Sequence, residues 1–342
     1  FVITDDKIPE FTKIKNISLK KELKLFTFKN KHFQIVSHNY KNEAQILKIK
    51  HENLIHEIRV NLVGKIQLKN ILMAVIAASK SNLDLKKIFS VIPRLSPVEG
   101  RFEKVGKIKN KSLVFLDYAH TPDALQTCIL NIREQFTDKH ISVLFGCGGD
   151  RDKGKRSKMG KIADKYADKI YLTDDNPRNE RPKKIRDEIK RGIKKNQIVE
   201  ISNRKEAIVK AINNLNTGDI LIVAGKGHEK IQQIGNRKVF LSDRQIILNS
   251  IKKKNFNLSK NLKINIFNER FDQNVLSSKS AINKASINSK SVKKNDIFFA
   301  IKGKKNDGNK FVRQAIQKKA SITVVNKIQK KLPRNKQVSS IN

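Results

Sequence analysis

Residues 141–178 read ISVLFGCGGDRDKGKRSKMGKIADKYADKIYLTDDNPR. The apolar runs Ile141–Phe145 and Ile170–Thr173 stand near the two ends of this stretch, and each is followed by a polar segment. Between them the apolar side chains recur at helical spacing: Met159, Ile162, Ala163 and Tyr166. Continuous apolar runs joined by an amphipathic helix are typical of buried parallel strands. The stretch therefore predicts a strand–helix–strand unit of a parallel sheet.

The same alternation continues on both sides of this unit. Further strand-like runs are Leu113–Leu116, Ile198–Ile201 and Ile220–Val223. A helix should follow the first of them, because Thr121 is a good capping residue and Pro122 is favoured in a first helical turn. We therefore expect a Rossmann-like, doubly wound α/β domain over residues 97–251.

Polar segments follow four of the predicted strands. They are Asp117–His120, Gly146–Asp152, Asp174–Arg178 and Gly225–Glu229. Each segment alone is as readily a solvated loop as a binding element. The carboxyl ends of parallel strands share one edge of the sheet, where ligands bind in open α/β folds. The four segments together therefore indicate a ligand site.

The residue types at this edge suit a zwitterion. Arg151 and Arg178 can grip a carboxylate, because the guanidinium fork matches its two oxygens. Glu229 can accept an ammonium group. Asp117 and His120 can contact the ribose or base of a nucleotide. An amino acid beside a nucleotide is the ligand pair that these side chains favour.

A P-loop-like pattern occurs in the second segment. Gly149–Lys155 fits the spacing G-x-x-x-x-G-K, but Arg156 stands where a Ser or Thr should contact magnesium, and two aspartates lie inside the frame. We do not expect a P-loop here. Cys128 and Cys147 have no metal-ligand spacing, and a reducing, cytoplasmic setting fits them.

The net charge of +41 suggests nucleic-acid binding at first sight. The lysines are scattered along the whole chain, however, and aromatic residues are not interleaved with them as a stacking surface requires. We therefore expect small-molecule substrates and no nucleic acid or membrane partner. The sequence contains neither a signal peptide nor an apolar run of membrane-spanning length.

The regions outside the central domain have a different sequence pattern. Residues 1–96 alternate short strand-like runs, such as Leu25–Phe28 and His32–Val36, with lysine-rich turns, and then predict helices over 67–79 and 85–91. Residues 252–262 read as a polar linker. Residues 263–342 predict a small third α/β unit with strands at 297–301 and 322–325.

Five motifs occur in a fixed order along the chain. They are DYAHTPDAL (117–125), FGCGGDRDKGKR (145–156), TDDNPR (173–178), VAGKGHE (223–229) and SDR (242–244). Over residues 64–250 this pattern resembles the Mur ligase family, in the branch that adds meso-diaminopimelate to UDP-N-acetylmuramoyl-L-alanyl-D-glutamate. Residues 1–96 resemble the end of that family's central ATPase domain. The segment VEGRFE (98–103) resembles its hinge into the C-terminal domain.

The resemblance implies an ATP-dependent amide-bond ligase of peptidoglycan precursor synthesis, with ATP and Mg²⁺ as cofactors. ATP would phosphorylate the D-glutamyl carboxylate, and the amine of diaminopimelate would attack the acyl phosphate. The carried-over diaminopimelate residues are Arg151, Asp175, Asn176, Pro177, Arg178, Gly225 and Glu229. The carried-over ATP residues are Asn70, Arg101, Asp117 and His120. Arg178 would select diaminopimelate over lysine, because lysine lacks the second carboxylate.

The chain departs from the family pattern in two ways. The family's P-loop, magnesium ligands and carbamylated lysine have no counterpart here, so we expect the catalytic residues upstream of Phe1 and this segment alone to be inactive. Residues 287–320 (INSKSVKKNDIFFAIKGKKNDGNKFVRQAIQKKA) resemble the opening of a second Mur ligase, of the D-alanyl-D-alanine-adding type, although Lys290 replaces the usual Arg. We interpret the chain as part of a bifunctional fusion. The alternatives are a non-catalytic amino-acid or nucleotide-binding module and a basic nucleic-acid-binding protein.

Overall fold

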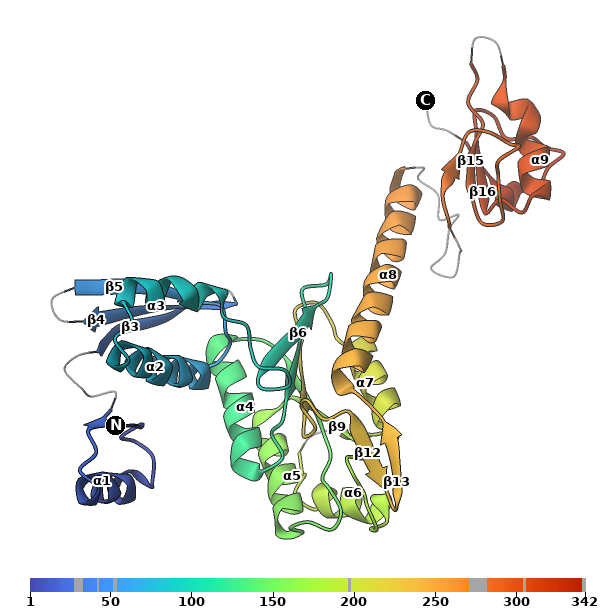
Figure 1. Cartoon of the computed structure of the whole chain (residues 1–342). Coiled ribbons are helices and arrows are strands. Elements are labelled where there is room, and N and C mark those ends of the chain that lie inside the picture. The colour runs from blue at the N-terminus through green and yellow to red at the C-terminus, as the bar shows by residue number, and fades with distance from the viewer. Residues whose placement is uncertain are drawn as a thin grey trace. The chain divides into compact units, whose positions relative to one another are not determined.

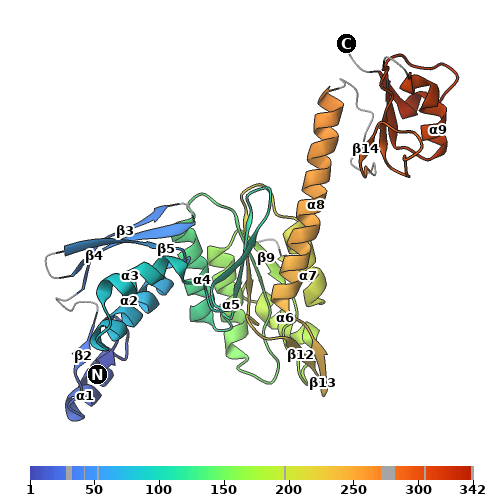
Figure 2. The same ribbon diagram turned by 45° about the horizontal axis from the view of Figure 1, so that its top comes forward.

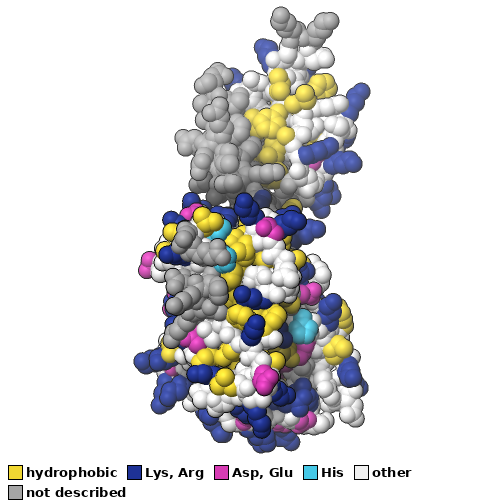
Figure 3. Space-filling model, turned by 60° about the vertical axis from the view of Figure 1, so that its left-hand side comes forward, with side chains coloured by type: hydrophobic (Ala, Val, Ile, Leu, Met, Phe, Trp, Pro, Cys, Tyr) yellow, Lys and Arg dark blue, Asp and Glu magenta, His cyan; other side chains and the backbone are white. Residues whose placement is uncertain are grey.

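The structure is a computed structural model, and it describes residues 1–27, 33–41, 43–51, 54–195, 198–303 and 306–339, except for the segment 271–281. It divides into two compact units, Phe1–Lys252 and Lys253–Asn342. Within these described ranges, no helix has the length and apolar character needed to cross a lipid bilayer. Lys and Arg side chains are spread over the face seen in Figure 3, with acidic and apolar side chains between them.

A six-stranded sheet forms the centre of the first unit. Its strand order is β10-β9-β8-β11-β7-β6. The strands are β6 (Glu103–Lys107), β7 (Leu113–Asp117), β8 (Ile141–Phe145), β9 (Lys169–Leu172), β10 (Ile198–Glu200) and β11 (Ile220–Ala224). The strands from β7 to β11 are parallel, and β6 pairs antiparallel with β7 at one edge. The apolar runs that predicted five parallel strands are thereby confirmed.

Helices cover both faces of this sheet. Apolar side chains of α4 (Pro122–Gln135), α5 (Gly154–Tyr166) and α6 (Pro182–Lys190) join one core cluster with the strands. The other face carries α7 (Arg204–Asn213) and the start of α8 (Asp243–Arg270), as Figures 1 and 2 show. Thr121 caps α4 as expected, because its side chain accepts from the backbone N–H of Ala124. The doubly wound fold is confirmed.

The beginning of the first unit contains a three-stranded antiparallel sheet. It consists of β3 (Gln34–Lys41), β4 (Ala44–His51) and β5 (Leu54–Val60). Apolar side chains of α2 (Lys65–Lys80) pack against it, and α3 (Leu85–Val91) with the 3₁₀ turn Ile92–Arg94 completes this layer. Both predicted helices are therefore present. Phe28 and His32, which we placed in strands, lie outside the described residues.

A helix also forms where we predicted only strands and turns. The chain passes from β1 (Val2–Ile3) into α1 (Phe11–Lys20) and then to β2 (Leu25–Phe26), which pairs parallel with β1. No capping side chain marks the start of α1, so the sequence signal for its beginning was weak.

The predicted linker over residues 252–262 is helical, because these residues lie inside α8. They contain no Gly or Pro, and Lys is a good helix former, so a polar composition did not break the helix. The boundary between the two units nevertheless falls at Lys252 and Lys253, inside this helix.

The second unit is a small parallel α/β structure. Its strands are β14 (Ala285–Ser286), β15 (Ile297–Phe299), β16 (Ile322–Val325) and β17 (Gln337–Ser339), in that spatial order. One face packs against α9 (Val312–Gln317), which follows the 3₁₀ turn Gly308–Phe311, and another 3₁₀ turn spans Arg334–Lys336. The predicted strands of this unit are confirmed, although β15 ends two residues earlier than expected.

Candidate functional site

The polar segments after the strands of the central sheet are joined by backbone hydrogen bonds. The N–H of Gly149 donates to the carbonyl oxygen of Asn176 at 2.9 Å, and the N–H of Gly225 donates to that of Asp117 at 3.1 Å. The loop after β8 thus contacts the loop after β9, and the loop after β11 contacts β7. The structure brings the four predicted segments to one edge of one sheet, which we call the rim.

Asp175 and Gly225 face each other across this rim. Asp175 is 8% exposed, and a Cβ placed on Gly225 would lie 2.9 Å from its Oδ2 atom. Gly225 also has a φ of +112°, which side chains with a Cβ rarely adopt. The glycine is therefore required both by the backbone conformation and by the close carboxylate.

Asn176, Lys226 and Glu229 form a hydrogen-bonded network at the centre of the rim. The Lys226 ammonium donates to Asn176 Oδ1 at 3.1 Å and to Glu229 Oε2 at 3.0 Å. Asn176 Nδ2 donates to the same Glu229 oxygen at 3.2 Å. Burial raises the pKa of Glu229, but the hydrogen bond and charge of Lys226, together with Asn176 and Tyr118, outweigh it and leave that pKa below its ordinary value. Glu229 is thus held as an anion.

Arg178 is fixed by its backbone as well as by its side chain. Its Nη1 atom donates to the carbonyl oxygen of Gly149 at 2.8 Å, and its φ of +48° places it in the left-handed region. Its N–H donates to Gln233 O at 3.1 Å, and its carbonyl accepts from the N–H of Gly235 at 2.7 Å. A two-stranded hairpin, β12 (Ile231–Ile234) with β13 (Arg237–Phe240), therefore holds the turn that carries the guanidinium.

Arg151 and Pro177 occupy different positions beside this turn. Arg151 is exposed, and its Nη1 atom donates to the carbonyl oxygen of its neighbour Asp150 at 3.3 Å. A Cβ on Gly148 would lie 2.8 Å from Arg178 Nη1 and 3.7 Å from Arg151 Cγ, so this glycine lies between the two arginines. The Pro177 carbonyl would be 1.9 Å from a Cβ on Gly149, which explains the glycine at this position.

Tyr118 lies among the residues that we expected near ATP. The Arg101 guanidinium stacks over its ring at 4.3 Å from the centroid, and the His120 ring lies 4.7 Å away. The ring of His228 is 5.3 Å from the same centroid, and the hydroxyl group of Tyr118 donates to Glu229 Oε1 at 3.3 Å. Tyr118 therefore connects the proposed nucleotide residues to the proposed amino-acid residues.

The Asp117 carboxylate is hydrogen-bonded to backbone N–H groups around it. It accepts from the N–H of Phe102 at 2.6 Å and from that of Ala119 at 2.8 Å. Burial raises the pKa of Asp117, against the opposing effect of these N–H groups and of the Arg101 charge. His120 lies beside it, with Nδ1 2.8 Å from the carbonyl oxygen of Tyr118.

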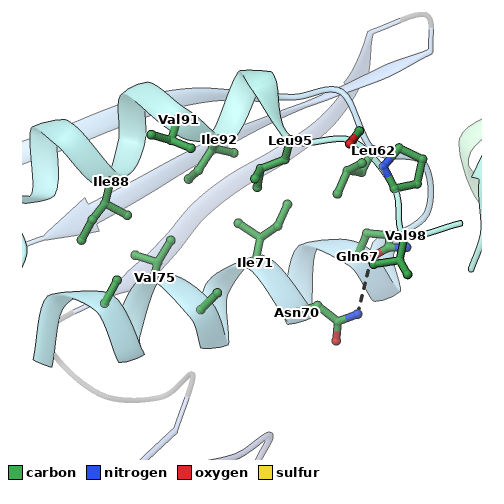
Figure 4. A pocket seen from close by; sticks show the side chains of 14 residues that line it. Leu62, Gln67, Asn70, Ile71, Val75, Ile88, Val91, Ile92, Leu95 and Val98 are labelled. Carbon is green, nitrogen blue, oxygen red and sulfur yellow. Dashed lines mark hydrogen bonds between the residues drawn. The ribbon is translucent and has the colours of Figure 1, made fainter. Parts of the chain in front are cut away.

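Asn70 lies apart from the other proposed ATP residues. It is on α2, and it lines a groove of about 400 Å³ between α2, α3 and the segment Leu95–Val98 (Figure 4). Its Nδ2 atom lies 3.5 Å from Gln67 Oε1, and the Gln67 side chain reaches the Arg101 carbonyl at 3.4 Å. The structure links Asn70 to Arg101 only through Gln67. Most of the groove is apolar.

Arg156 departs from the P-loop pattern and takes part in a network of ion pairs and hydrogen bonds. Arg156 lies on α5 with its side chain fully buried, and it pairs with Glu180 at 2.8 Å and Glu188 at 2.7 Å. Its Nη2 atom also donates to the Gly148 carbonyl at 3.1 Å. The residue that replaces Ser or Thr is therefore a structural cation. In the described part of the chain, no cluster of three or more His, Cys, Asp or Glu side chains is placed to hold a metal ion.

Some residues of the rim were not assigned from the sequence. Lys226 and Tyr118 stand inside the quoted motifs, but lysine and tyrosine there carry no signal that separates a buried partner from an exposed side chain. Gln232 and Gln233 contact Asp175 O and Asn176 Oδ1 from the hairpin, at 2.6 and 3.0 Å. The alternation of Ile231–Ile234 with Arg237–Phe240 around Gly235 was the available signal for that hairpin.

The fold and the rim define the first unit as a doubly wound α/β domain with a polar ligand-binding edge. Residues 100–227 match the family model described as Mur ligase, glutamate ligase domain, and residues 281–340 match the one described as Mur ligase family, catalytic domain. These two stretches of the chain are therefore similar to parts of Mur ligases.

Several relatives carry one name, UDP-N-acetylmuramoyl-L-alanyl-D-glutamate--2,6-diaminopimelate ligase. The one from Rickettsia felis is 39% identical over 72% of this chain and 46% of its own length. The one from Rhizobium meliloti is 48% identical over 55% of this chain and 38% of its own length. The chain spans about half the length of the curated relatives it matches.

Solved structures agree with the fold. A ligase of the same name superposes with a TM-score of 0.55 at 28% identity, covering 74% of this chain and 53% of that one. The UDP-N-acetylmuramate-alanine ligase from Thermotoga maritima gives a TM-score of 0.50 at 16% identity over 76% of this chain and 52% of its own, and this likeness concerns the fold alone.

Proposed function

We propose that this chain carries the amino-acid-binding part of an ATP-dependent ligase that adds meso-diaminopimelate to UDP-N-acetylmuramoyl-L-alanyl-D-glutamate in the cytoplasm. The observation that carries the proposal is the rim, where Arg178 stands beside Asn176 and the carboxylates of Asp175 and Glu229. The five motifs and the names of the relatives support the same reading.

The side-chain amide of Asn176 is oriented so that its nitrogen can donate to a carboxylate of the amino acid. Its Oδ1 atom accepts from Lys226 Nζ at 3.1 Å and from the N–H of Gln233 at 3.0 Å, and neither group can accept in return. The amide nitrogen must therefore face the other way, where it donates to Glu229 and has a second N–H for a ligand. With Arg178, it would bind the distal carboxylate of diaminopimelate, with Arg151 at the outer edge.

The ammonium group on the same carbon would lie against the acidic side of the rim. Asp175 is buried beside Gly225, and the Oε1 atom of Glu229 accepts only from Tyr118 among the described contacts. The Gly225 backbone and Pro177 shape this side of the site. A carboxylate and an ammonium group on one carbon would thus each face groups of opposite charge, Arg178 for the carboxylate and Asp175 with Glu229 for the ammonium group.

A nucleotide would lie on the neighbouring part of the rim. Arg101 and Tyr118 form a stacked cationic pair that suits a phosphate or an adenine ring, with His120 beside them and Asp117 holding the loop. We assign Asn70 to the same ligand, although it lines a separate groove. ATP would supply the acyl phosphate; Mg²⁺ binding and phosphoryl transfer are assigned to none of the described residues.

We also propose the larger arrangement that the sequence suggested. Residues 1–96 would be the end of a central ATPase domain, and residues 97–251 the C-terminal domain. Residues 263–342 would be the start of a second ligase, of the D-alanyl-D-alanine-adding type. The match of residues 281–340 to a Mur ligase family model supports the presence of a second ligase segment, and its substrate is a proposal from the motif alone.

Binding of the free amino acid tests the function. The ¹⁵N-labelled chain is titrated with meso-diaminopimelate and with L-lysine, and the backbone signals of the rim are followed. We expect saturable shifts at Asn176, Arg178 and Glu229 with diaminopimelate and much weaker ones with lysine. Equal responses to the two amino acids, or no response at the rim, would refute the assignment.

A further inference from the structure

Lys226 is a cation in an unusual place. It lies in the loop after β11, and its side chain is 0% exposed although most lysines of this chain are at the surface. A buried ammonium group is stable only when it is paired and hydrogen-bonded.

The three N–H groups of Lys226 are all used inside the protein. They donate to Asn176 Oδ1 at 3.1 Å, to Glu229 Oε2 at 3.0 Å and to the carbonyl oxygen of Ile231 at 2.6 Å. An ammonium group has three donors and no acceptor. Lys226 thus has no donor left for a ligand, and any effect on binding must pass through its neighbours.

Two of those neighbours are residues that we propose as ligand contacts. Asn176 Oδ1 is held by Lys226 and by the N–H of Gln233, which fixes the direction of the amide nitrogen. Glu229 Oε2 is held by Lys226 and by that same nitrogen. The third contact ties Lys226 to β12, the strand that follows the Glu229 loop. One ammonium group therefore fixes an amide and a carboxylate at the same time.

We propose that Lys226 is a positioning residue of the rim, which turns the Asn176 amide nitrogen toward the carboxylate of the amino acid and holds the Glu229 carboxylate ready for its ammonium group. This inference rests on the proposed function for the identity of the ligand. The arrangement of the three side chains itself does not depend on which ligand binds.

The competing explanation is that Lys226 only stabilises the loop. A double-mutant cycle separates the two, because residues that act through each other have non-additive effects. Lys226→Met, Asn176→Ala and the double variant are titrated with meso-diaminopimelate. Lys226→Gln, which keeps two donors, replaces the methionine variant if that variant does not fold. Lys230→Met, at an exposed position in the same loop, is the matched control.

We expect Lys226→Met to weaken binding about tenfold to a hundredfold, as loss of a hydrogen bond to a charged group does. In the Asn176→Ala background the same change should cost clearly less, because the amide is already absent and only the positioning of Glu229 remains to be lost. Lys230→Met should bind as the wild type does. Equal losses in both backgrounds would overturn the positioning role and leave a structural one.

A measurement without ligand keeps this inference separate from the proposed function. The side-chain amide signals of Asn176 are assigned by their loss in Asn176→Asp and compared between the wild type, Lys226→Met and Lys226→Gln. We expect both substitutions to shift these signals and to accelerate their exchange with water. If the wild type fails to bind diaminopimelate, the proposed function is wrong, and unchanged amide signals would independently overturn the role of Lys226.

Discussion

Gly225 lies so close to Asp175 that a Cβ at the glycine would stand 2.9 Å from Asp175 Oδ2. With its φ of +112°, this glycine is doubly constrained. We expect Gly225→Ala to lower the free energy of unfolding by about 1–3 kcal/mol from backbone strain alone. It should also displace the Asp175 carboxylate and weaken diaminopimelate binding, as chemical denaturation and titration would measure.

Gly235 provides the matched comparison, because its φ is +55° and a Cβ there would meet nothing within 4 Å. Gly235→Ala should lower the free energy of unfolding by about 1–2 kcal/mol, the usual cost of a left-handed residue. Binding should be retained. Equal binding losses in the two alanine variants would contradict a specific role for the contact between Gly225 and Asp175.

Arg204 of α7 and Asp243 of α8 form an ion pair on the face of the sheet that these two helices cover. Both side chains are 0% exposed, and Arg204 Nη2 lies 2.7 Å from Asp243 Oδ2 and 2.9 Å from the carbonyl oxygen of Ala224. Asp243→Asn leaves a buried guanidinium without its counter-ion, so we expect a loss of about 3–5 kcal/mol in the free energy of unfolding. Urea denaturation measures it.

The exposed pair of Lys48 with Glu57 is the control for this prediction. Its side chains are 46% and 60% exposed, at a separation of 3.5 Å. Glu57→Gln should change the free energy of unfolding by less than about 1 kcal/mol. A similar loss of unfolding free energy in Asp243→Asn and Glu57→Gln would contradict the prediction that burial makes the first pair more important for stability.

Glu180 makes the stability depend on pH in a defined window. The hydrogen bond from Arg156, opposed by burial and aided by the Asp150 N–H and the Arg156 charge, lowers the pKa of Glu180 from 4.5 to about 2. A carboxylate with a lower pKa in the folded state stabilises the fold above its unfolded pKa. That contribution is lost as the pH falls from about 4.5 to about 2.

We therefore expect Glu180→Gln to be less stable than the wild type at neutral pH and to lose stability less steeply between pH 4.5 and 2. Denaturation curves at several pH values measure this slope. Glu206→Gln, at an exposed position of α7, should keep the wild-type slope. An unchanged slope in Glu180→Gln would show that another group dominates the acid sensitivity.

The sheet and the rim were predictable because their signals are local. Buried parallel strands such as β8 and β11 are continuous apolar runs, and the polar residues after them must share one edge. Thr121 and Pro122 marked the start of α4 for the same reason. The ligand class that the motifs suggest through resemblance stays a proposal.

The contacts within the rim were not predictable from local patterns. Nothing in the sequence distinguishes Lys226, which is buried, from Lys230, which is exposed four residues later. The hydrogen bonds of Arg178 to the β12–β13 hairpin join segments more than fifty residues apart, so they depend on the folded sheet. The helix over residues 252–262 was missed because composition alone suggested a linker.

We propose that Arg178 makes this rim a site for an amino acid with a second carboxylate. The most direct measurement is the affinity of the wild type, Arg178→Ala and Arg178→Lys for meso-diaminopimelate and for L-lysine, by the same titration. We predict that the alanine variant loses about tenfold or more in diaminopimelate affinity and most of its preference over lysine, and that the lysine variant recovers only part, because an ammonium group cannot grip both oxygens. Unchanged diaminopimelate affinity in Arg178→Ala would contradict the account.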